Sequence, residues 1–134
     1  MEIYAKPDRP TKAANPDYFT GDVFQDPIVT APEPARVRAL RVHFMPGGRT
    51  NWHTHPLGQT LYVLSGVGCV QKQGEPIQTI REGDTVWIAP GEVHWHGAAP
   101  DHAMCHVAIQ EALDGSNVDW LEPVSDDDYT GASA

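Results

Sequence analysis

Proline and glycine divide this chain into short segments. The 134 residues contain 12 of each. Proline interrupts helices because it lacks an amide hydrogen, and glycine favours turns. The segments between them are typical of strands, and we expect strands at residues 37–45, 60–65, 67–72, 76–81, 85–89 and 103–110. Only residues 111–121 have room for a helical turn. This pattern predicts an all-β sandwich or small barrel, whose interior can hold one ligand.

The length is that of a single domain, which we expect to span residues 1–134. Six prolines in residues 1–35 exclude a long helix there and predict an extended N-terminal arm. Residues 36–112 are predicted to form the barrel core, and residues 122–134 an acidic tail. Within that tail, we expect the run Asp126-Asp127-Asp128 to be a solvated terminus rather than a cation site.

Charge and hydropathy exclude several classes of partner. The net charge is −9, and no lysine or arginine follows Arg81. An acidic surface repels phosphate backbones, so we expect no nucleic-acid partner. No apolar run approaches the ~18–20 residues of a membrane span, and the N-terminus lacks the apolar centre of a signal peptide. We therefore expect a cytoplasmic protein with no membrane partner, in which Cys69 and Cys105 remain reduced.

Two His-x-His pairs are the residues most indicative of a functional site: His53-Thr54-His55 and His94-Trp95-His96. In a strand, residues two apart point to the same face, so each pair projects both imidazoles one way. Imidazole is the commonest side-chain ligand of transition metals. The two pairs together predict a metal site, and Gln59 can return to it after the turn at residues 56–58.

The last long strand has a polar inner face and an apolar outer face. His106, Ala108 and Gln110 share one phase, and Cys105, Val107 and Ile109 share the other. Buried polar groups need partners, so we expect His106 and Gln110 to line a pocket. The alternative for His106 is a core imidazole bonded to the backbone. His43 and His102 are expected to be surface residues.

The chain resembles the cupin superfamily in two motifs. Residues 47–66 follow the spacing G-x5-H-x-H-x3-Q-x6-G, with glutamine where the cupin motif usually has glutamate. Residues 83–94 follow G-x5-A-x-G-x2-H, with alanine at the usual proline, and Ala98 stands where that motif usually ends in asparagine. The resemblance implies the cupin double-stranded β-helix, a jelly-roll-like barrel. It also implies a metal held by His53, His55, Gln59 and His94.

A narrower resemblance covers nearly the whole chain. Residues 17–21, 52–61, 90–97, 106–111 and 119–120 look like the small bacterial cupins that act as manganese hydroxynitrile lyases. Glutamine in place of glutamate is the pattern of that group. This resemblance implies one divalent transition metal, Mn²⁺ first, with Fe²⁺, Ni²⁺ and Zn²⁺ as alternatives. The same signature also occurs in small cupins of no known activity.

The resemblance implies an enzyme that cleaves cyanohydrins to an aldehyde and cyanide, or forms cyanohydrins from these two compounds. We expect His106 to be the base, because its phase faces the interior and imidazole suits proton transfer near neutrality. His96 would position or protonate the cyanide. Thr50 would bind the substrate oxygen, or else stabilise a turn. An apolar pocket for the substrate is expected from Leu40, Val42, Leu61, Val63, Ala108 and, with its amide, Gln110.

Two other functions remain open at this point. One is a metal-dependent dioxygenase acting on a small organic substrate, although no carboxylate stands at the motif position. The other is a non-catalytic cupin that binds a small molecule. We also expect a homodimer or homotetramer, because an outward apolar set could pair with a second copy. The set is Tyr62, Leu64, Val107 and Ile109, which could equally fill a second layer within one chain.

Overall fold

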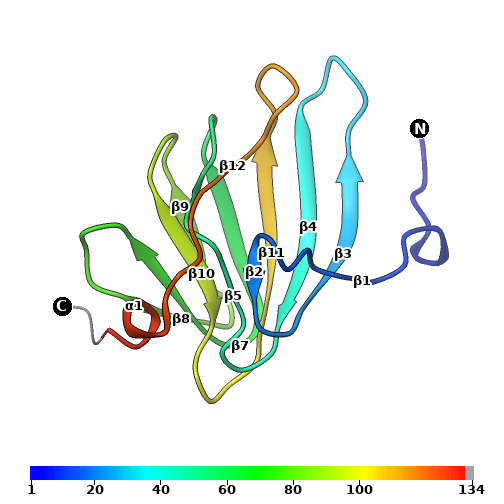
Figure 1. The fold of residues 1–134 in the computed structure, drawn as a ribbon. Coiled ribbons are helices and arrows are strands. Elements are labelled where there is room, and N and C mark those ends of the chain that lie inside the picture. Colours follow the sequence, from blue (N-terminus) through cyan, green and yellow to red (C-terminus); the bar gives the residue numbers. More distant parts are fainter. Residues whose placement is uncertain (132–134) are drawn as a thin grey trace.

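Strand β7 (Gln59–Lys72) organises the molecule, because it takes part in two sheets. The structure is a computed structural model that describes residues 1–131 (Figure 1). Residues 59–66 of β7 pair with one set of strands, and residues 67–72 pair with another. Between them Gly66 has a φ of 83°. The prediction of two separate strands here was wrong, because the glycine bends the strand without ending it.

Sheet A contains the first part of β7 and five further strands, all antiparallel. They are β1 (Lys12–Ala13), β3 (Val23–Thr30), β4 (Val37–Phe44), β9 (Thr85–Ile88) and β11 (Met104–Glu111). Strand β3 was not expected, because it contains Pro27. A register shift between Pro27 and Val29 accommodates the proline. The first 35 residues are therefore not only an extended arm.

Sheet B contains the second part of β7 and six further strands, again antiparallel. They are β2 (Phe19–Thr20), β5 (Arg49–Thr50), β6 (His53–Thr54), β8 (Gln78–Arg81), β10 (His94–Ala98) and β12 (Asp119–Trp120). The two sheets curl toward each other as a barrel (Figure 1). The all-β barrel and the hairpin of β7 and β8 are confirmed.

Apolar side chains and histidines both line the barrel interior. Phe44, Leu61 and Val63 have no exposed surface, and Val42, Met104 and Ala108 are also buried. Along β11 the burial alternates as predicted, with His106, Ala108 and Gln110 inside. This alternation places the polar side chains of His106 and Gln110 in the interior.

The C-terminal region differs from the prediction. Residues 111–121 hold strand β12 and an isolated bridge instead of a helical turn. Helix α1 (Asp126–Thr130) forms in the acidic run, where the Ser125 hydroxyl accepts a hydrogen bond from the Asp128 amide. Buried Arg49 donates to the Val124 carbonyl at 2.7 Å and to the Asp126 carboxylate at 2.9 Å. The run is thus part of the fold, and residues 132–134 of the predicted tail lie outside the described residues.

A buried carboxylate fastens the N-terminal segment to sheet A. Asp26 accepts hydrogen bonds from Thr11 and from Lys6, the latter at 3.2 Å. His43 on β4 lies 2.8 Å from the second carboxylate oxygen. These partners stabilise the ionised form and hold the pKa of Asp26 well below its usual range. His43 is accordingly partly covered, whereas His102 is exposed as expected.

The outer face of sheet A exposes large apolar side chains. Tyr62 is 44% exposed, Trp87 63% and Ile109 39%. Leu64 and Val107 on the same strands are half-buried. These residues do not fill a second layer within the described part of this chain. Cys69 and Cys105 are free, as expected. No helix in residues 1–131 has the length and apolar character needed to cross a membrane.

Candidate metal centre

Five histidines lie in the barrel interior, on three strands and the turn after β6. His53, His94 and His96 bring one nitrogen each to within 4.8 Å of one another. The antiparallel pairing of β6 with β10 sets His53 directly opposite His94. The His55 ring centroid is 4.9 Å from that of His53 and 5.6 Å from that of His94. The two His-x-His pairs therefore face one another, as the sequence predicted.

Backbone carbonyls fix the tautomers of three of these rings. The Nδ1 atoms of His53, His55 and His94 lie 2.8, 2.6 and 2.9 Å from the carbonyl oxygens of Asn51, Asn117 and Glu92. A carbonyl can only accept, so each Nδ1 carries the hydrogen and each Nε2 keeps a free lone pair. Metal-binding histidines show this arrangement. The buried Nε2 of His55 has no partner in the described structure.

Gln59 faces the same point through a relay of amides. The Gln110 amide donates to the Arg38 carbonyl at 3.1 Å, so its oxygen is free to accept from the Gln59 amide at 3.0 Å. This fixes the Gln59 oxygen toward His94 Nε2, at 3.3 Å. Two acceptors thus face each other inside the barrel. A cation bound between them would satisfy both, so these residues fit a metal.

Burial keeps the candidate ligands neutral. The pKa of His53 lies well below its usual value because the ring is desolvated and close to His94 and His55. Burial also lowers the pKa of His55, and it lowers that of His94 to about 4. Neutral imidazoles are the form that binds metal. Three imidazoles and an amide leave the positive charge of a divalent ion uncompensated, which favours anionic ligands.

His96 and His106 form a second pair beside the first cluster. His106 Nε2 lies 2.9 Å from His96 Nδ1. His96 Nε2 and His106 Nδ1 are buried without partners in the described structure. Desolvation lowers the pKa of His106 to about 4 and that of His96 well below its usual value. The partner of His106 Nε2 is thus a side chain, whereas the alternative considered for His106 was a core imidazole bonded to the backbone.

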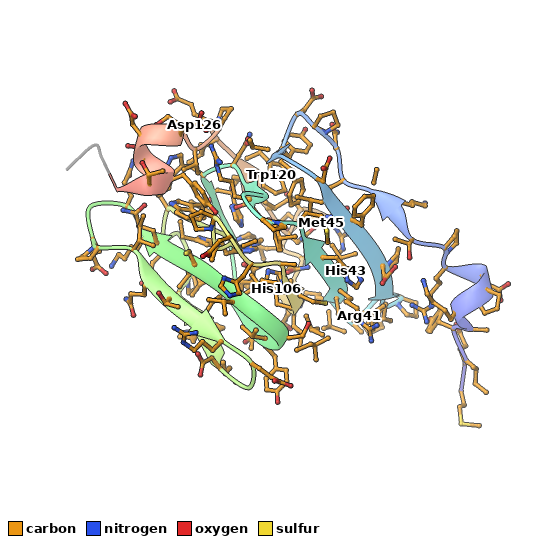
Figure 2. The ribbon with its side chains drawn as sticks, turned by 90° about the horizontal axis from the view of Figure 1, so that it is seen from below. Arg41, His43, Met45, His106, Trp120 and Asp126 are labelled. Atoms are coloured by element: carbon orange, nitrogen blue, oxygen red, sulfur yellow. The ribbon has the colours of Figure 1, made fainter. Side chains whose placement is uncertain are left out.

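The structure orders this pair differently from the sequence prediction. His96, not His106, reaches the nitrogen cluster of His53 and His94. His106 lies behind it, against Phe44 at a ring-centroid distance of 5.2 Å. In Figure 2, His106 is seen near the centre of the molecule. The Thr50 hydroxyl accepts a hydrogen bond from the His96 amide at 3.2 Å, which joins β5 to β10.

The predicted pocket residues lie inside the barrel. Leu40 is half-buried, and the other five are buried: Val42, Leu61, Val63, Ala108 and Gln110. Gln110 orients Gln59 and is more than a lining residue. A separate groove of about 1300 Å³ lies between the turn of β7–β8 and α1, and none of the histidines lines it.

Some supporting groups escaped the sequence prediction. The carbonyls of Asn51, Glu92 and Asn117 orient the rings, but any residue type has a carbonyl, so composition carries no signal for them. Trp120 on β12 lies over the His53 ring, with 4.8 Å between centroids. Its place in the motif at residues 119–120 was the available signal.

The chain belongs to the cupin family. The family model for the cupin domain matches residues 40–109, which hold all four predicted metal ligands and the His96–His106 pair. The chain is 58% identical, over 113 residues, to a protein of Granulicella tundricola named (R)-mandelonitrile lyase. That match covers 84% of this chain and 86% of the relative.

Solved structures agree with this assignment. A cupin-like protein from Thermotoga maritima is 36% identical, with a TM-score of 0.86 over 98% of this chain and 97% of that one. The polyketide cyclase RemF from Streptomyces resistomycificus has a TM-score of 0.72 over 100% of this chain and 94% of its own, at 19% identity. The latter likeness shows the fold alone.

Proposed function

We propose that this protein is a metal-dependent hydroxynitrile lyase, which cleaves cyanohydrins to an aldehyde and cyanide and catalyses the reverse addition. The observation that carries the proposal is the 58% identity to the relative named (R)-mandelonitrile lyase. The interior agrees with it, because neutral histidines and an amide converge there beside a second pair of histidines.

His53, His55, Gln59 and His94 would hold the metal. Their free acceptor atoms and the carbonyl-fixed tautomers support this set. Mn²⁺ is the ion we propose from the resemblance, with Fe²⁺, Ni²⁺ and Zn²⁺ as alternatives. A bound divalent ion supplies Lewis-acid stabilisation of negative charge on an oxygen or on cyanide.

His96 is an alternative to His55 as the third imidazole ligand of the metal, because its nitrogen lies within 4.8 Å of those of His53 and His94. No backbone carbonyl fixes its tautomer, since its Nδ1 faces the His106 ring, which can donate or accept; we therefore assign His96 to the substrate. His55→Ala should weaken Mn²⁺ binding strongly, whereas His96→Ala should leave the affinity nearly unchanged. Calorimetric titration of both variants with Mn²⁺ separates the two assignments, and the opposite ranking would exchange them.

The His96–His106 pair supplies the base. His96 Nε2 accepts the hydroxyl proton of the cyanohydrin, and its Nδ1 proton passes to His106 Nε2 across 2.9 Å. The oxygen electrons form the carbonyl as the C–CN bond breaks, and cyanide leaves with the bonding pair. Return of the proton gives hydrogen cyanide and restores the neutral pair. Buried Val42, Leu61 and Val63 surround the organic group and exclude water.

The test is mandelonitrile cleavage by the Mn²⁺-loaded protein, followed by the absorbance of benzaldehyde. His106→Ala should retain the metal and lose ~100- to 10,000-fold in rate, as expected for removal of an acid–base group. Equal rates at matched metal content would remove His106 from the mechanism. Oxygen uptake with an organic substrate would instead support a dioxygenase. No turnover of cyanohydrins by the metal-loaded wild type would favour a binding protein.

We further propose that the protein self-associates through the outer face of sheet A. Exposed Tyr62, Trp87 and Ile109 lie on three neighbouring strands, and the half-buried Leu64 and Val107 extend the patch. Apolar patches of this kind mark interfaces. Light scattering at micromolar concentration should give a multiple of 14.7 kDa. A monomer mass would exclude a stable homodimer or homotetramer.

A further inference from the structure

An aromatic side chain from outside the ligand motifs covers the His53 ring. Trp120 on β12 is paired with His53 on β6, and the ring centroids are 4.8 Å apart with an angle of 37° between the planes. The other rings around His53 belong to His55, His94 and His96, at 4.2 to 5.2 Å. Trp120 is thus the neighbour that restrains His53 without competing for a metal.

Trp120 is itself held in place. Its indole stacks on the Tyr18 ring, at 4.7 Å and 10°, and meets the edge of Phe19 at 5.5 Å. The next residue, Leu121, donates its amide hydrogen to the Trp52 carbonyl at 2.8 Å. Stacking and backbone pairing together prevent the indole from rotating away from His53.

Asn51 joins both aromatic segments to the same histidine. It is 3% exposed, and its side-chain amide donates to the carbonyls of Asp17 at 3.0 Å and Leu121 at 3.2 Å. Its amide hydrogen is donated to the Tyr18 carbonyl at 2.8 Å. Its own carbonyl accepts the Nδ1 hydrogen of His53. One buried residue therefore fixes the tautomer of His53 and the position of the rings that cover it.

We infer that Trp120 is a positioning residue for His53: the indole, stacked on Tyr18 and carried by a segment that Asn51 binds through the Leu121 carbonyl, holds the imidazole in the orientation that binds a divalent metal. The inference rests on the metal site of the proposed function and not on the lyase reaction. Tyr18 and Trp120 both lie outside residues 40–109, which match the cupin model. The metal affinity of this chain thus depends on its N- and C-terminal segments.

The test is the Mn²⁺ affinity, measured from the electron paramagnetic resonance signal of free aqueous Mn²⁺. Trp120→Leu should weaken binding by about 10-fold or more, because loss of groups that orient metal ligands costs about 10–100-fold. Trp120→Phe should restore most of the affinity, since it keeps an aromatic face against His53. Phe24→Leu is the matched control: Phe24 is 38% exposed on β3, a strand that carries none of the proposed ligands, and its replacement should leave the affinity unchanged.

Tyr18→Leu guards against a Trp120→Leu variant that does not fold. Tyr18 is 37% exposed, so its replacement removes the stack at little cost to the core and should weaken Mn²⁺ binding in the same direction. Unchanged affinity in a folded Trp120→Leu protein, or in Tyr18→Leu if the former is unfolded, would overturn the inference, even if the melting temperature fell.

The wild type separates the two proposals. If it binds Mn²⁺ but does not cleave mandelonitrile, the lyase assignment fails. The Mn²⁺ affinities of the Trp120 and Tyr18 variants then still test the positioning role of Trp120. If it cleaves mandelonitrile and Trp120→Leu binds Mn²⁺ equally well, the positioning role of Trp120 is refuted and the lyase assignment stands. A wild type that binds none of Mn²⁺, Fe²⁺, Ni²⁺ and Zn²⁺ would overturn both the metal site and the positioning role of Trp120.

Discussion

Replacing Gly66 by alanine should destabilise the protein far more than replacing a glycine of the same backbone conformation elsewhere. Gly66 has a φ of 83°, and a Cβ there would lie 1.9 Å from the Ala103 carbonyl oxygen. That is about 1 Å inside the 3.0 Å below which Cβ atoms essentially never go. The contact is with backbone, so a strand would have to move where β7 passes from one sheet to the other.

The magnitude follows from two contributions. A non-glycine residue in the left-handed region costs about 1–2 kcal/mol, and an added methyl in a packed site costs about 1–3 kcal/mol. The reduced freedom of the unfolded chain returns about 0.4–1 kcal/mol. We therefore expect Gly66→Ala to lower the free energy of unfolding by about 3 kcal/mol, a large part of the ~5–15 kcal/mol typical of a domain.

Gly74 provides the matched control. Its φ is 84°, and a Cβ there would meet nothing within 4 Å. Gly74→Ala should thus cost only the backbone contribution, about 1 kcal/mol after the gain in the unfolded chain. Urea unfolding followed by tryptophan fluorescence gives both values. Equal losses in the two variants would show that the contact with Ala103 contributes nothing, and would refute the reasoning.

Three further outcomes are expected. Arg49→Ala should lower the free energy of unfolding in urea by about 2–4 kcal/mol, because buried Arg49 binds the Val124 carbonyl and lies over Tyr129. Asp126→Asn should lower it by less than about 1 kcal/mol, since that carboxylate is 95% exposed. Equal losses in the two variants would contradict the view that the Val124 and Tyr129 contacts dominate. Asp26→Asn should lower the melting temperature at pH 7. The pKa of Asp26 is depressed in the folded state. The difference in melting temperature between wild type and variant should therefore be largest above the unfolded pKa of about 3.9 and should shrink as the pH falls below it. A difference that stays constant down to pH 2 would show that the ionised Asp26 carboxylate does not cause the stabilisation. Chelation should lower the melting temperature, and Mn²⁺ at 100 times its Kd should stabilise the folded state by about 2.7 kcal/mol; identical melting curves would show that the folded state binds no metal.

The sequence predicted what depends on local periodicity. Alternation along β11 placed His106 and Gln110 inside, and the two His-x-His spacings brought together His53, His94 and His96 on facing strands and His55 in the turn after β6. These features follow from the period of a strand and need no knowledge of distant partners. The fold class was predictable for the same reason.

The rest depends on contacts between distant residues. Pro27 argued against a strand, but the bulge beside it is possible only because β4 is there to pair with. The acidic run packs on the barrel because Arg49, 75 residues before Val124, donates to the carbonyl of that residue just ahead of the helix. Likewise, His96 and not His106 reaches the nitrogen cluster, since phase gives the face of a strand but not the depth of each ring.

The pairing of β6 with β12 has a consequence for synthesis on the ribosome. Arg49 and its partner Val124 are 75 residues apart, and His55 and Asn117 are 62 apart. At about 5–20 residues per second, the ribosome needs roughly 4–15 s to make the residues between Arg49 and Val124. During that interval His53 and His55 lack the contacts that residues 117–120 make with them in the folded protein. A divalent metal bound as proposed would meet the final arrangement of His53 and His55 only after residues 117–120 have been made, because Asn117 and Trp120 hold these two rings.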